Sequence, residues 1–304
     1  MSVTEAMTVD VTETPATEGW VKGRSLWGDA IHRIGKDKLA IACFFIVVFY
    51  AVIALAAKFG LIASTWGQAV GPAYQAPSLK SLPLLFGTDI FGRSVFYKVI
   101  QGTRIAMSVG LVSSLISIPI GIFLGAVAGY FGGWVDDAVV WFYTTVSSIP
   151  NIMLLIAITF IMGKGLVAVY VALGATSWVG LTRVIRGEFI KHKDREYVVA
   201  ARSLGASHFS RIFKHILPNV SHLVIINLSI LFMSAIKSEV ILSFLGLGAQ
   251  GEPSWGVMID DAKLELARGV WWELAGATVA MFFVVLAFNI LGDALRDALD
   301  PKIK

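Results

Sequence analysis

The chain has 304 residues, of which 56% are hydrophobic and only 15% are charged, and its mean hydropathy is +0.75. A soluble chain of ordinary composition has about a quarter charged residues, so the composition excludes a typical soluble domain and indicates an integral membrane protein. The net charge of +4 is small enough to come from basic cytoplasmic loops and does not indicate nucleic-acid binding. The one cysteine excludes a disulfide within the chain and a cysteine-rich metal site.

Two segments precede the first apolar run of the chain. Residues 1–19 contain four acidic residues and no Lys or Arg, the opposite of the basic start of a signal peptide, so we expect a disordered cytoplasmic tail. Residues 20–38 combine an apolar helical stripe with basic neighbours, which is typical of an amphipathic helix lying on the membrane surface. An ordinary solvated linker is the alternative. The stripe consists of Trp27, Ala30, Ile31 and Ile34.

Six apolar segments predict an all-α integral membrane protein with six transmembrane helices, because a membrane helix needs about 20 predominantly apolar residues. The first span is residues 39–57, and a long outer loop, residues 58–104, follows it. The other five spans lie in a core domain, residues 105–292, and residues 293–304 form a cytoplasmic tail. The predicted spans of the core are 105–130, a span between 137 and 164 with Pro150 and Asn151 in its interior, 166–181, 220–236 and 274–290.

The distribution of Lys and Arg predicts which side of the membrane each loop faces, because cytoplasmic loops are enriched in these residues. With the N-terminus inside, the inner segments contain sixteen of the 25 Lys and Arg, and the outer segments contain nine. Eight of the sixteen lie in residues 182–222. Five of the nine lie in the long outer loop, where charge matters less. Both termini are therefore predicted to be cytoplasmic.

A ridge of small residues lies within the second span, at Gly121, Gly125 and Gly129. This spacing lets another helix approach closely. The sequence leaves open whether that helix belongs to this chain or to another subunit. Pro119 and Pro150 predict local bends in their own spans.

The spans contain almost no ionisable residue, whereas proton-coupled carriers and ion pumps usually place carboxylates or His within their spans. The sequence has no Walker-type phosphate loop and no nucleophile elbow or zinc-protease motif, so neither catalytic residues nor a nucleotide site are predicted. His208, His215 and His222 repeat every seven residues, but Pro218 separates the last two and no Cys or carboxylate cluster joins them. No metal site is predicted, and the energy for any transport must come from another chain.

Two outer segments combine turn residues with charges. Around Asp89, two glycines favour a tight turn, in which Asp89 would pair with Arg93 or cap the next helix. Residues 240–249 are apolar but too short to span, and they are predicted to form a re-entrant or interfacial piece. Beside this piece, Lys237 and Glu239 are predicted to form an ion pair at the interface. The alternative is that they face a transport pathway.

The densest positive charge of the chain lies in a cytoplasmic loop, residues 184–219. The second half of this loop predicts a short helix that Ser207 caps and that ends at Pro218. Four apolar residues recur at helical spacing on this helix, and basic residues flank them. An apolar helix face outside the bilayer needs a partner, and we predict that the partner is another protein. The face consists of Phe209, Ile212, Phe213 and Ile216, and the flanking residues are Arg211, Lys214 and His215.

This loop resembles the cytoplasmic signature of ABC importer permeases, which reads E-A-A, three residues, G, nine residues, I-x-L-P. Val199 stands in place of the Glu, and His215 stands in place of the Ile. The matching residues are Ala200, Ala201, Gly205, Leu217 and Pro218. Three other segments are similar to the second permease of dipeptide and oligopeptide importers. They are the outer motif Gly87, Thr88, Asp89, Ile90, Phe91, Gly92 and Arg93, with Ser94 in place of a final Asp; residues 242–248 with 253–256; and residues 292–301.

The resemblance implies a six-span permease with the type I ABC importer fold, located in a bacterial inner membrane and without catalytic residues. Its implied partners are a homologous second permease, two ABC ATPase subunits that bind ATP and Mg, and an extracytoplasmic substrate-binding protein. The implied substrates are di- or oligopeptides, with nickel chelates, glutathione or peptide antibiotics as alternatives in the same family. A self-sufficient secondary carrier or channel and a structural scaffold are the other hypotheses, and the charge-poor spans argue against the carrier.

The resemblance also implies which residues contact an ATPase. The short helix after Gly205 would dock in a groove on one ATPase, so that ATP-driven closure moves the spans between inward-open and outward-open states. The outer loops would meet the binding protein, and the chain itself is expected to bind no cofactor and no nucleic acid. The implied coupling residues are Ala200, Ala201, Gly205, Ala206, Ser207, Phe209, Ile212, Phe213, Ile216, Leu217 and Pro218.

Overall fold

The computed structural model describes residue 28 and residues 32–299. The predicted tail, residues 1–19, and most of the predicted interfacial helix, including Trp27, Ala30 and Ile31, lie outside the described residues. Ile34, the last member of the predicted stripe, is described, and it packs against two buried residues at the end of the last helix. The described part of the segment that precedes the first span is therefore in contact with the end of α12.

In the described residues the regular elements are helices. The β-bridges there are two isolated residue pairs. This all-α architecture is the predicted one. The helices are α2 (Lys38–Lys58), the 3-10 turn η1 (Leu82–Leu84), α3 (Val95–Phe131), α4 (Gly133–Ser147), α5 (Asn151–Ile161), α6 (Leu166–Thr176), α7 (Trp178–His192), α8 (Glu196–Ser203), α9 (His208–Ser210), the π-helical turn η2 (Arg211–Ile216), α10 (Leu217–Phe244), α11 (Trp255–Leu266) and α12 (Trp272–Leu299).

Five helical segments are long and apolar enough to cross a membrane: Lys38–Lys58, Val95–Phe131, Leu166–His192, His208–Phe244 and Trp272–Leu299. A sixth candidate is the pair α4 and α5, whose axes are bent by 84° at a short break. The predicted count of six is reached when this pair is one broken span. Pro150, which sits directly before α5, is a residue that cannot continue a helix without losing a hydrogen bond.

The ends of several spans differ from the predicted ones. Helix α3 begins ten residues before the predicted position, because the Ser94 hydroxyl accepts a hydrogen bond from the Tyr97 backbone and caps the helix. The fourth span continues through Arg183 to His192, since a helix can extend beyond the hydrocarbon with basic side chains at its end. Helix α12 continues to Leu299, so most of the predicted tail is helical.

Two predictions around α10 are wrong. Pro218 lies in the first turn of α10 rather than at the end of the preceding helix. The helical segment continues from His208 through Pro218 to Phe244, and the π-helical turn η2 lies directly before α10. Of the two alternatives for residues 240–249, a re-entrant or an interfacial piece, the re-entrant one is wrong, because residues 240–244 continue α10. Their apolar character instead reflects burial within the chain, because Leu242 and Leu247 pack into a core cluster with α3 and α6.

The small-residue ridge of α3 packs against α7 of the same chain. A β-carbon on Gly125 would lie 2.7 Å from the carbonyl oxygen of Thr182, and one on Gly129 would lie 2.6 Å from the carbonyl oxygen of Arg186. Contacts this short leave no room for a side chain, so glycine is required for the two helices to approach. The partner of the ridge, which the sequence left open, is therefore a helix of this chain.

A second close contact holds α11 to the bundle. The Trp255 side chain is fully buried, and its indole N–H donates to the Val99 carbonyl at 3.1 Å. A β-carbon on Gly102 would lie 2.4 Å from this indole ring. Trp255 thus occupies a space that the absence of a side chain at Gly102 provides, and it also packs edge-on against Tyr50 of α2.

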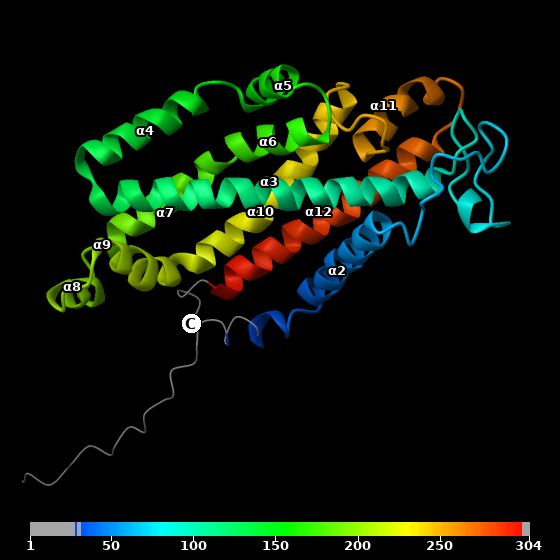
Figure 1. Ribbon diagram of the computed structural model, residues 1–304. Helices are drawn as coiled ribbons and strands as arrows, with labels where there is room; N and C mark the ends of the chain where they lie inside the picture. The colour runs from blue at the N-terminus through cyan, green and yellow to red at the C-terminus, as the bar shows by residue number, and fades with distance from the viewer. Residues whose placement is uncertain (1–27, 29–31, 300–304) are drawn as a thin grey trace, which may run out of the picture.

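Helix α3 runs almost the full length of the bundle (Figure 1). At one end lie the cyan loop, residues 59–94, and α11; we call this the loop end. At the other end lie α8, α9 and η2; we call this the basic end. The two sets of residues singled out from the sequence, the cytoplasmic loop and the outer motif, therefore lie at opposite ends of the molecule.

Candidate functional site

The basic end is built by two short helices joined at a glycine turn. Helix α8 ends before Gly205, which has a φ of +81°, a left-handed conformation that glycine adopts readily. The backbone N–H groups of Gly205 and Ala206 donate to carbonyls of α8 and close this turn. The Ser207 hydroxyl then accepts from the Ser210 N–H at 3.2 Å. The predicted cap at Ser207 is confirmed.

The predicted apolar face is divided between the core and the surface. Ile212 and Ile216 are buried in a cluster with Phe189 of α7. Phe209 is 68% exposed and Phe213 is 39% exposed, and their ring centroids lie 4.4 Å apart. The prediction of one continuous exposed face is therefore corrected: α7 and α8 cover one edge of it, and an aromatic pair remains outside.

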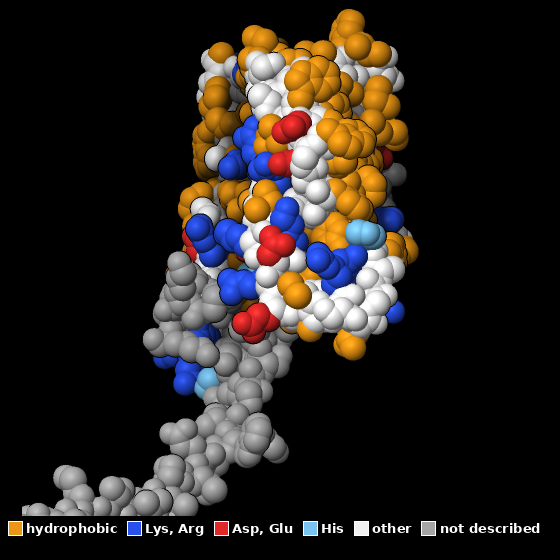
Figure 2. Space-filling model, turned by 90° about the vertical axis from the view of Figure 1, so that its left-hand side faces the viewer, with side chains coloured by type: hydrophobic (Ala, Val, Ile, Leu, Met, Phe, Trp, Pro, Cys, Tyr) orange, Lys and Arg blue, Asp and Glu red, His pale blue; other side chains and the backbone are white. Residues whose placement is uncertain are grey.

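Exposed apolar side chains extend beyond this aromatic pair. Leu204 is 88% exposed and Val199 is 45% exposed, and both belong to the same loop. We call Val199, Leu204, Phe209 and Phe213 together the apolar patch. Figure 2 looks onto this end of the molecule, where Lys and Arg side chains gather near exposed hydrophobic ones. An apolar surface rimmed by charge outside a bilayer is typical of a protein-binding surface.

The eleven residues implied to couple to an ATPase differ in exposure. Three are buried within the chain: Ala201, Ile212 and Ile216. Two are half-buried: Ala206 and Leu217. Six are exposed: Ala200, Gly205, Ser207, Phe209, Phe213 and Pro218. The buried members can only support the surface from beneath.

Arg211 joins the apolar patch to the end of α3, a role that the sequence did not reveal. Its side chain is buried rather than exposed beside the predicted face. The guanidinium lies 5.7 Å from the centre of the Tyr130 ring and 3.2 Å from the His208 ring nitrogen. Tyr130 also hydrogen-bonds that nitrogen at 3.1 Å. Arg211, His208 and Tyr130 thus connect α9 to the end of α3.

The outer motif forms the predicted tight turn at the loop end. Gly87 and Gly92 have φ values of +70° and +71°. Asp89 accepts from the backbone N–H groups of Phe91 and Arg93 at 2.9 Å each, and from the Arg93 side chain at 2.7 Å. The predicted pair of Asp89 and Arg93 is confirmed, and the alternative role of capping the next helix belongs to Ser94 instead.

Asp89 also contacts Lys98 of α3, which sequence reasoning counted only as a loop charge. The Lys98 ammonium lies 3.2 Å from Asp89 and 3.7 Å from Asp261, and it contacts Glu273 of α12. Burial by itself raises the pKa of Asp89, but Lys98 and Arg93 outweigh it and hold that pKa below its ordinary value. Glu273 lies 175 residues from Lys98, so no local pattern indicates the contact.

The predicted ion pair between Lys237 and Glu239 is not formed. Glu239 is fully buried, whereas Lys237 is exposed. The Ser243 hydroxyl donates to the Glu239 carboxyl at 2.5 Å, which is the contact expected between residues four apart on a helix.

A groove with both apolar and polar walls follows α10 from the α4–α5 break. Near the break, a cavity of about 380 Å³ is lined by Ser147, Pro150 and Asn151, together with Ser177 and Ser234. Irregular backbone at membrane depth is tolerated only where it is buried in protein or lines a water-filled cavity. The break between α4 and α5 therefore lies where polar side chains line a cavity.

The groove continues toward the basic end. A second cavity, of about 420 Å³, shares Ile230 with the first and reaches His222 and Arg296. Asn227 lies between these points on α10. The helix thus presents hydrogen-bonding side chains along a line from the middle of the bundle to its basic end.

Two family models match the chain. Residues 117–304 match the model described as "Binding-protein-dependent transport system inner membrane component". Residues 25–77 match the "N-terminal TM domain of oligopeptide transport permease C". Together these matches include the first span, the apolar patch and the groove.

Characterised relatives match over nearly the whole chain. The dipeptide transport system permease protein DppC of Bacillus subtilis is 39% identical, over 91% of this chain and 86% of the relative. The oligopeptide transport system permease protein OppC of Haemophilus influenzae is 36% identical, over 93% and 90%. The glutathione transport system permease protein GsiD of Pectobacterium atrosepticum is 34% identical, over 92% and 93%.

Solved structures of lower identity share the fold. An amino acid ABC transporter superposes with a TM-score of 0.51 at 19% identity, over 64% of this chain and 91% of that chain. An inward-facing MetNI methionine ABC transporter gives 0.50 at 18% identity, over 66% and 94%. The chain therefore belongs to the binding-protein-dependent transport system inner membrane components, and within them to the permease C type of DppC and OppC, with the type I ABC importer permease fold.

Proposed function

We propose that this chain forms half of the translocation pathway for di- or oligopeptides in an ATP-driven importer. A homologous permease supplies the other half of the pathway. Two ATPase subunits, which themselves bind ATP and Mg, dock at the basic end. An extracytoplasmic binding protein delivers the substrate to the loop end. The complex lies in a bacterial inner membrane with both termini of this chain in the cytoplasm.

The apolar patch at the basic end is the observation that supports this proposal most directly. The rings of Phe209 and Phe213 contact each other and are exposed at the basic end, at the start of the helical segment that leads into α10. Burying an aromatic side chain against a partner there is worth about 1.5–3 kcal/mol. The surrounding Lys and Arg, which Figure 2 displays, agree with a cytoplasmic location. The patch would fit into a groove of an ATPase, and Arg211 would pass its movement to α3.

The groove along α10 supports a peptide as the substrate. Its walls near the α4–α5 break offer hydroxyl and amide groups, Ser147, Asn151 and Ser234 among them. Such groups hydrogen-bond the repeating N–H and C=O groups of any peptide, and they do not select for side-chain charge. The relatives named for dipeptide and oligopeptide transport agree with this substrate class.

Glutathione is the second candidate, because one relative is named for its transport. It is also a peptide, and the hydroxyl and amide groups near the α4–α5 break suit it equally. Uptake of labelled dipeptides, longer peptides and glutathione by cells lacking this gene, with and without the gene restored, distinguishes the two substrates.

Charge placed in the apolar patch tests the docking assignment. We expect Phe209→Asp and Phe213→Asp to remain in the membrane but to lose co-purification with the ATPase and to abolish peptide uptake. Leu264→Asp, at a 78% exposed residue of α11 at the loop end, is the matched control and should retain ATPase binding. Normal ATPase binding and uptake in both patch variants would contradict the assignment.

A further inference from the structure

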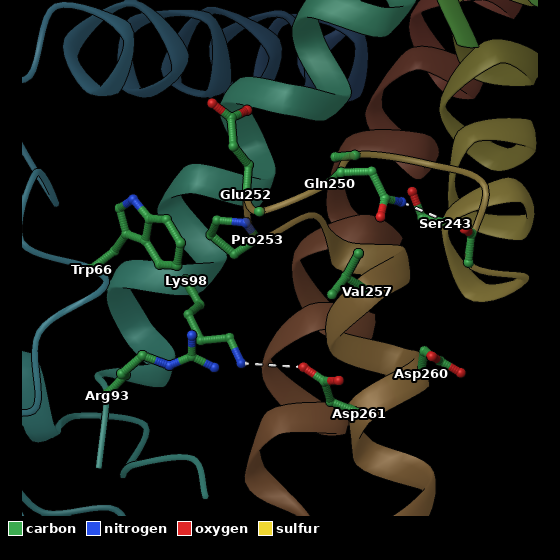
Figure 3. A pocket seen from close by; sticks show the side chains of 13 residues that line it. Trp66, Arg93, Lys98, Ser243, Gln250, Glu252, Pro253, Val257, Asp260 and Asp261 are labelled. Carbon is green, nitrogen blue, oxygen red and sulfur yellow. Dashed lines mark hydrogen bonds and ion pairs between the residues drawn. The ribbon is translucent and has the colours of Figure 1, made fainter. Parts of the chain in front are cut away.

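A buried group of charges at the loop end contains more carboxylates than cations. It joins the outer motif, the start of α3, α11 and the start of α12. Four carboxyl groups face two basic groups, and Figure 3 shows Arg93, Lys98 and Asp261 of this group from the side of a neighbouring pocket. The group, called the ion cluster below, consists of Asp89, Arg93, Lys98, Asp261, Glu265 and Glu273.

The hydrogen bonds that the ion cluster forms among the described residues leave two buried carboxyl oxygens without a donor. The Lys98 ammonium has three N–H donors, and it contacts Asp89, Asp261 and Glu273. The Arg93 side chain donates to Asp89. Glu265 and Glu273 each keep one buried carboxyl oxygen for which the described residues offer no hydrogen-bond partner. Their side chains are 3% and 0% exposed, so bulk water does not replace the missing donor.

Glu265 on α11 and Glu273 on α12 are buried neighbours in the ion cluster, and the protonation of each affects the other. Ionised carboxylates only accept hydrogen bonds, whereas a protonated carboxyl group also donates one. Two buried carboxylates that share a site cannot both be ionised without a large repulsion. A bound metal ion is not indicated, because the described residues include no group of three His, Cys, Asp or Glu arranged to hold one. The missing donor is therefore best supplied by a proton.

We propose that Glu265 and Glu273 share one bound proton and form a proton-binding site at the loop end of the bundle. The other charged groups that face this site are Lys98 on α3, Asp261 on α11 and Asp89 in the outer motif. With the proton bound, four carboxyl groups and two basic groups give the ion cluster a net charge of −1 rather than −2. Burial also raises the pKa of Glu265, and neither the hydrogen bond to Glu273 nor the charge of Lys98 cancels this effect.

A pocket that reaches the solvent lies beside the ion cluster. Lys98 and Asp261 line a pocket of about 310 Å³, together with Trp66, Glu252 and Asp260 (Figure 3). The Asp261 side chain is 47% exposed, so it contacts both the solvent and the buried ammonium. Proton exchange with the outer solution can therefore pass through Asp261 and water in this pocket without opening the helices.

The bound proton makes the loop end sensitive to alkaline conditions. A glutamate with a raised pKa binds more protons in the folded than in the unfolded chain, so stability falls as pH rises from the ordinary glutamate range through the raised value. Loss of the proton adds a negative charge among three helices and the outer motif. The contacts that hold α11 and α12 against α3 would weaken first, at the face that meets the binding protein in the proposed function.

Infrared spectroscopy of the full-length chain in lipid nanodiscs tests the proton directly. Glu239 is also buried, so the measurement uses a Glu239→Gln background to remove an overlapping signal. We expect a protonated-carboxyl stretch that persists at neutral pH, disappears at alkaline pH, and shifts when glutamate is labelled with ¹³C. Glu265→Gln and Glu273→Gln should each abolish it, whereas Asp261→Asn should retain it.

Two results would overturn the proposal. One is the absence of a protonated-carboxyl signal at neutral pH in the ¹³C-labelled Glu239→Gln protein that carries no other substitution. The other is a signal that survives in both Gln variants. A melting temperature measured against pH gives a second readout: it should fall at alkaline pH in the parent chain and remain level in Glu265→Gln. Neither readout depends on a substrate or an ATPase, so the result stands apart from the proposed function.

Discussion

Lys98 holds the loop end together, and its replacement by Met is the sharpest test of that role. The substitution keeps the length of the side chain and removes the one cation that contacts both Asp89 and Glu273. These two carboxyl groups are 1% and 0% exposed, so water cannot replace the ammonium. Breaking a buried ion pair by removing one partner costs about 3–5 kcal/mol, and we expect a loss of that size.

The loss of stability should depend on pH, because protonation neutralises the buried carboxylates that Lys98→Met leaves without a cation. We therefore expect Lys98→Met to be more destabilising at pH of about 8 than at pH of about 5. The measurement is unfolding of the purified chain by SDS in mixed micelles, followed by circular dichroism. Combining Lys98→Met with Glu273→Gln should recover part of the stability, since the double variant leaves one fewer buried charge without a partner.

An exposed lysine of the same end serves as the control. Lys263 pairs with Asp260 on the surface of α11, and both side chains are more than a third exposed. Surface pairs contribute about 0–1 kcal/mol, so Lys263→Met should have a small effect. Equal losses in Lys98→Met and Lys263→Met would refute the reasoning that burial makes the Lys98 contacts strong.

Two glycine substitutions test close approach with matched controls. Gly125→Val places a side chain against a backbone carbonyl of α7 at 2.7 Å. We expect it to lower the stability in thermal unfolding by about 1–3 kcal/mol or more. Gly180→Val, on α7 with open space around it, should have a mild effect. Gly92→Ala brings a β-carbon to 2.2 Å from a loop carbonyl at a φ of +71°, while Gly60→Ala has the same φ and open space. Gly60→Ala should lose only the left-handed penalty of roughly 1–2 kcal/mol, and a similar loss in Gly92→Ala would contradict the steric argument.

Local features of the chain were predictable because their causes are local. A membrane span must satisfy its backbone hydrogen bonds within one helix, so a run of apolar residues is enough to place α2 within one residue of its predicted ends. The turn around Asp89 depends on two glycines and an aspartate within seven residues, and the structure contains it as predicted. The Ser207 cap acts over three residues and was predictable for the same reason.

The division of the predicted coupling face was not predictable from its own residues. Helical spacing places Phe209, Ile212, Phe213 and Ile216 together, but it does not say which neighbour covers them. The answer depends on where α7 and α8 pack, and they bury Ile212 and Ile216. The same limit applies to Arg211, whose partners Tyr130 and His208 become neighbours only when α9 folds against the end of α3.

The sequence by itself determined the class of this protein, the approximate positions of its apolar helices and its family, since apolar runs and short motifs act along the chain. The tertiary structure alone decided how charges and glycines are partnered. The α3 glycines contact α7, the indole of Trp255 lies in the space beside Gly102, and Lys98 contacts Glu273 across 175 residues of chain. The physical reason is that burial, which makes an ion pair strong or a side chain impossible, is a property of neighbours in space and not of neighbours in sequence.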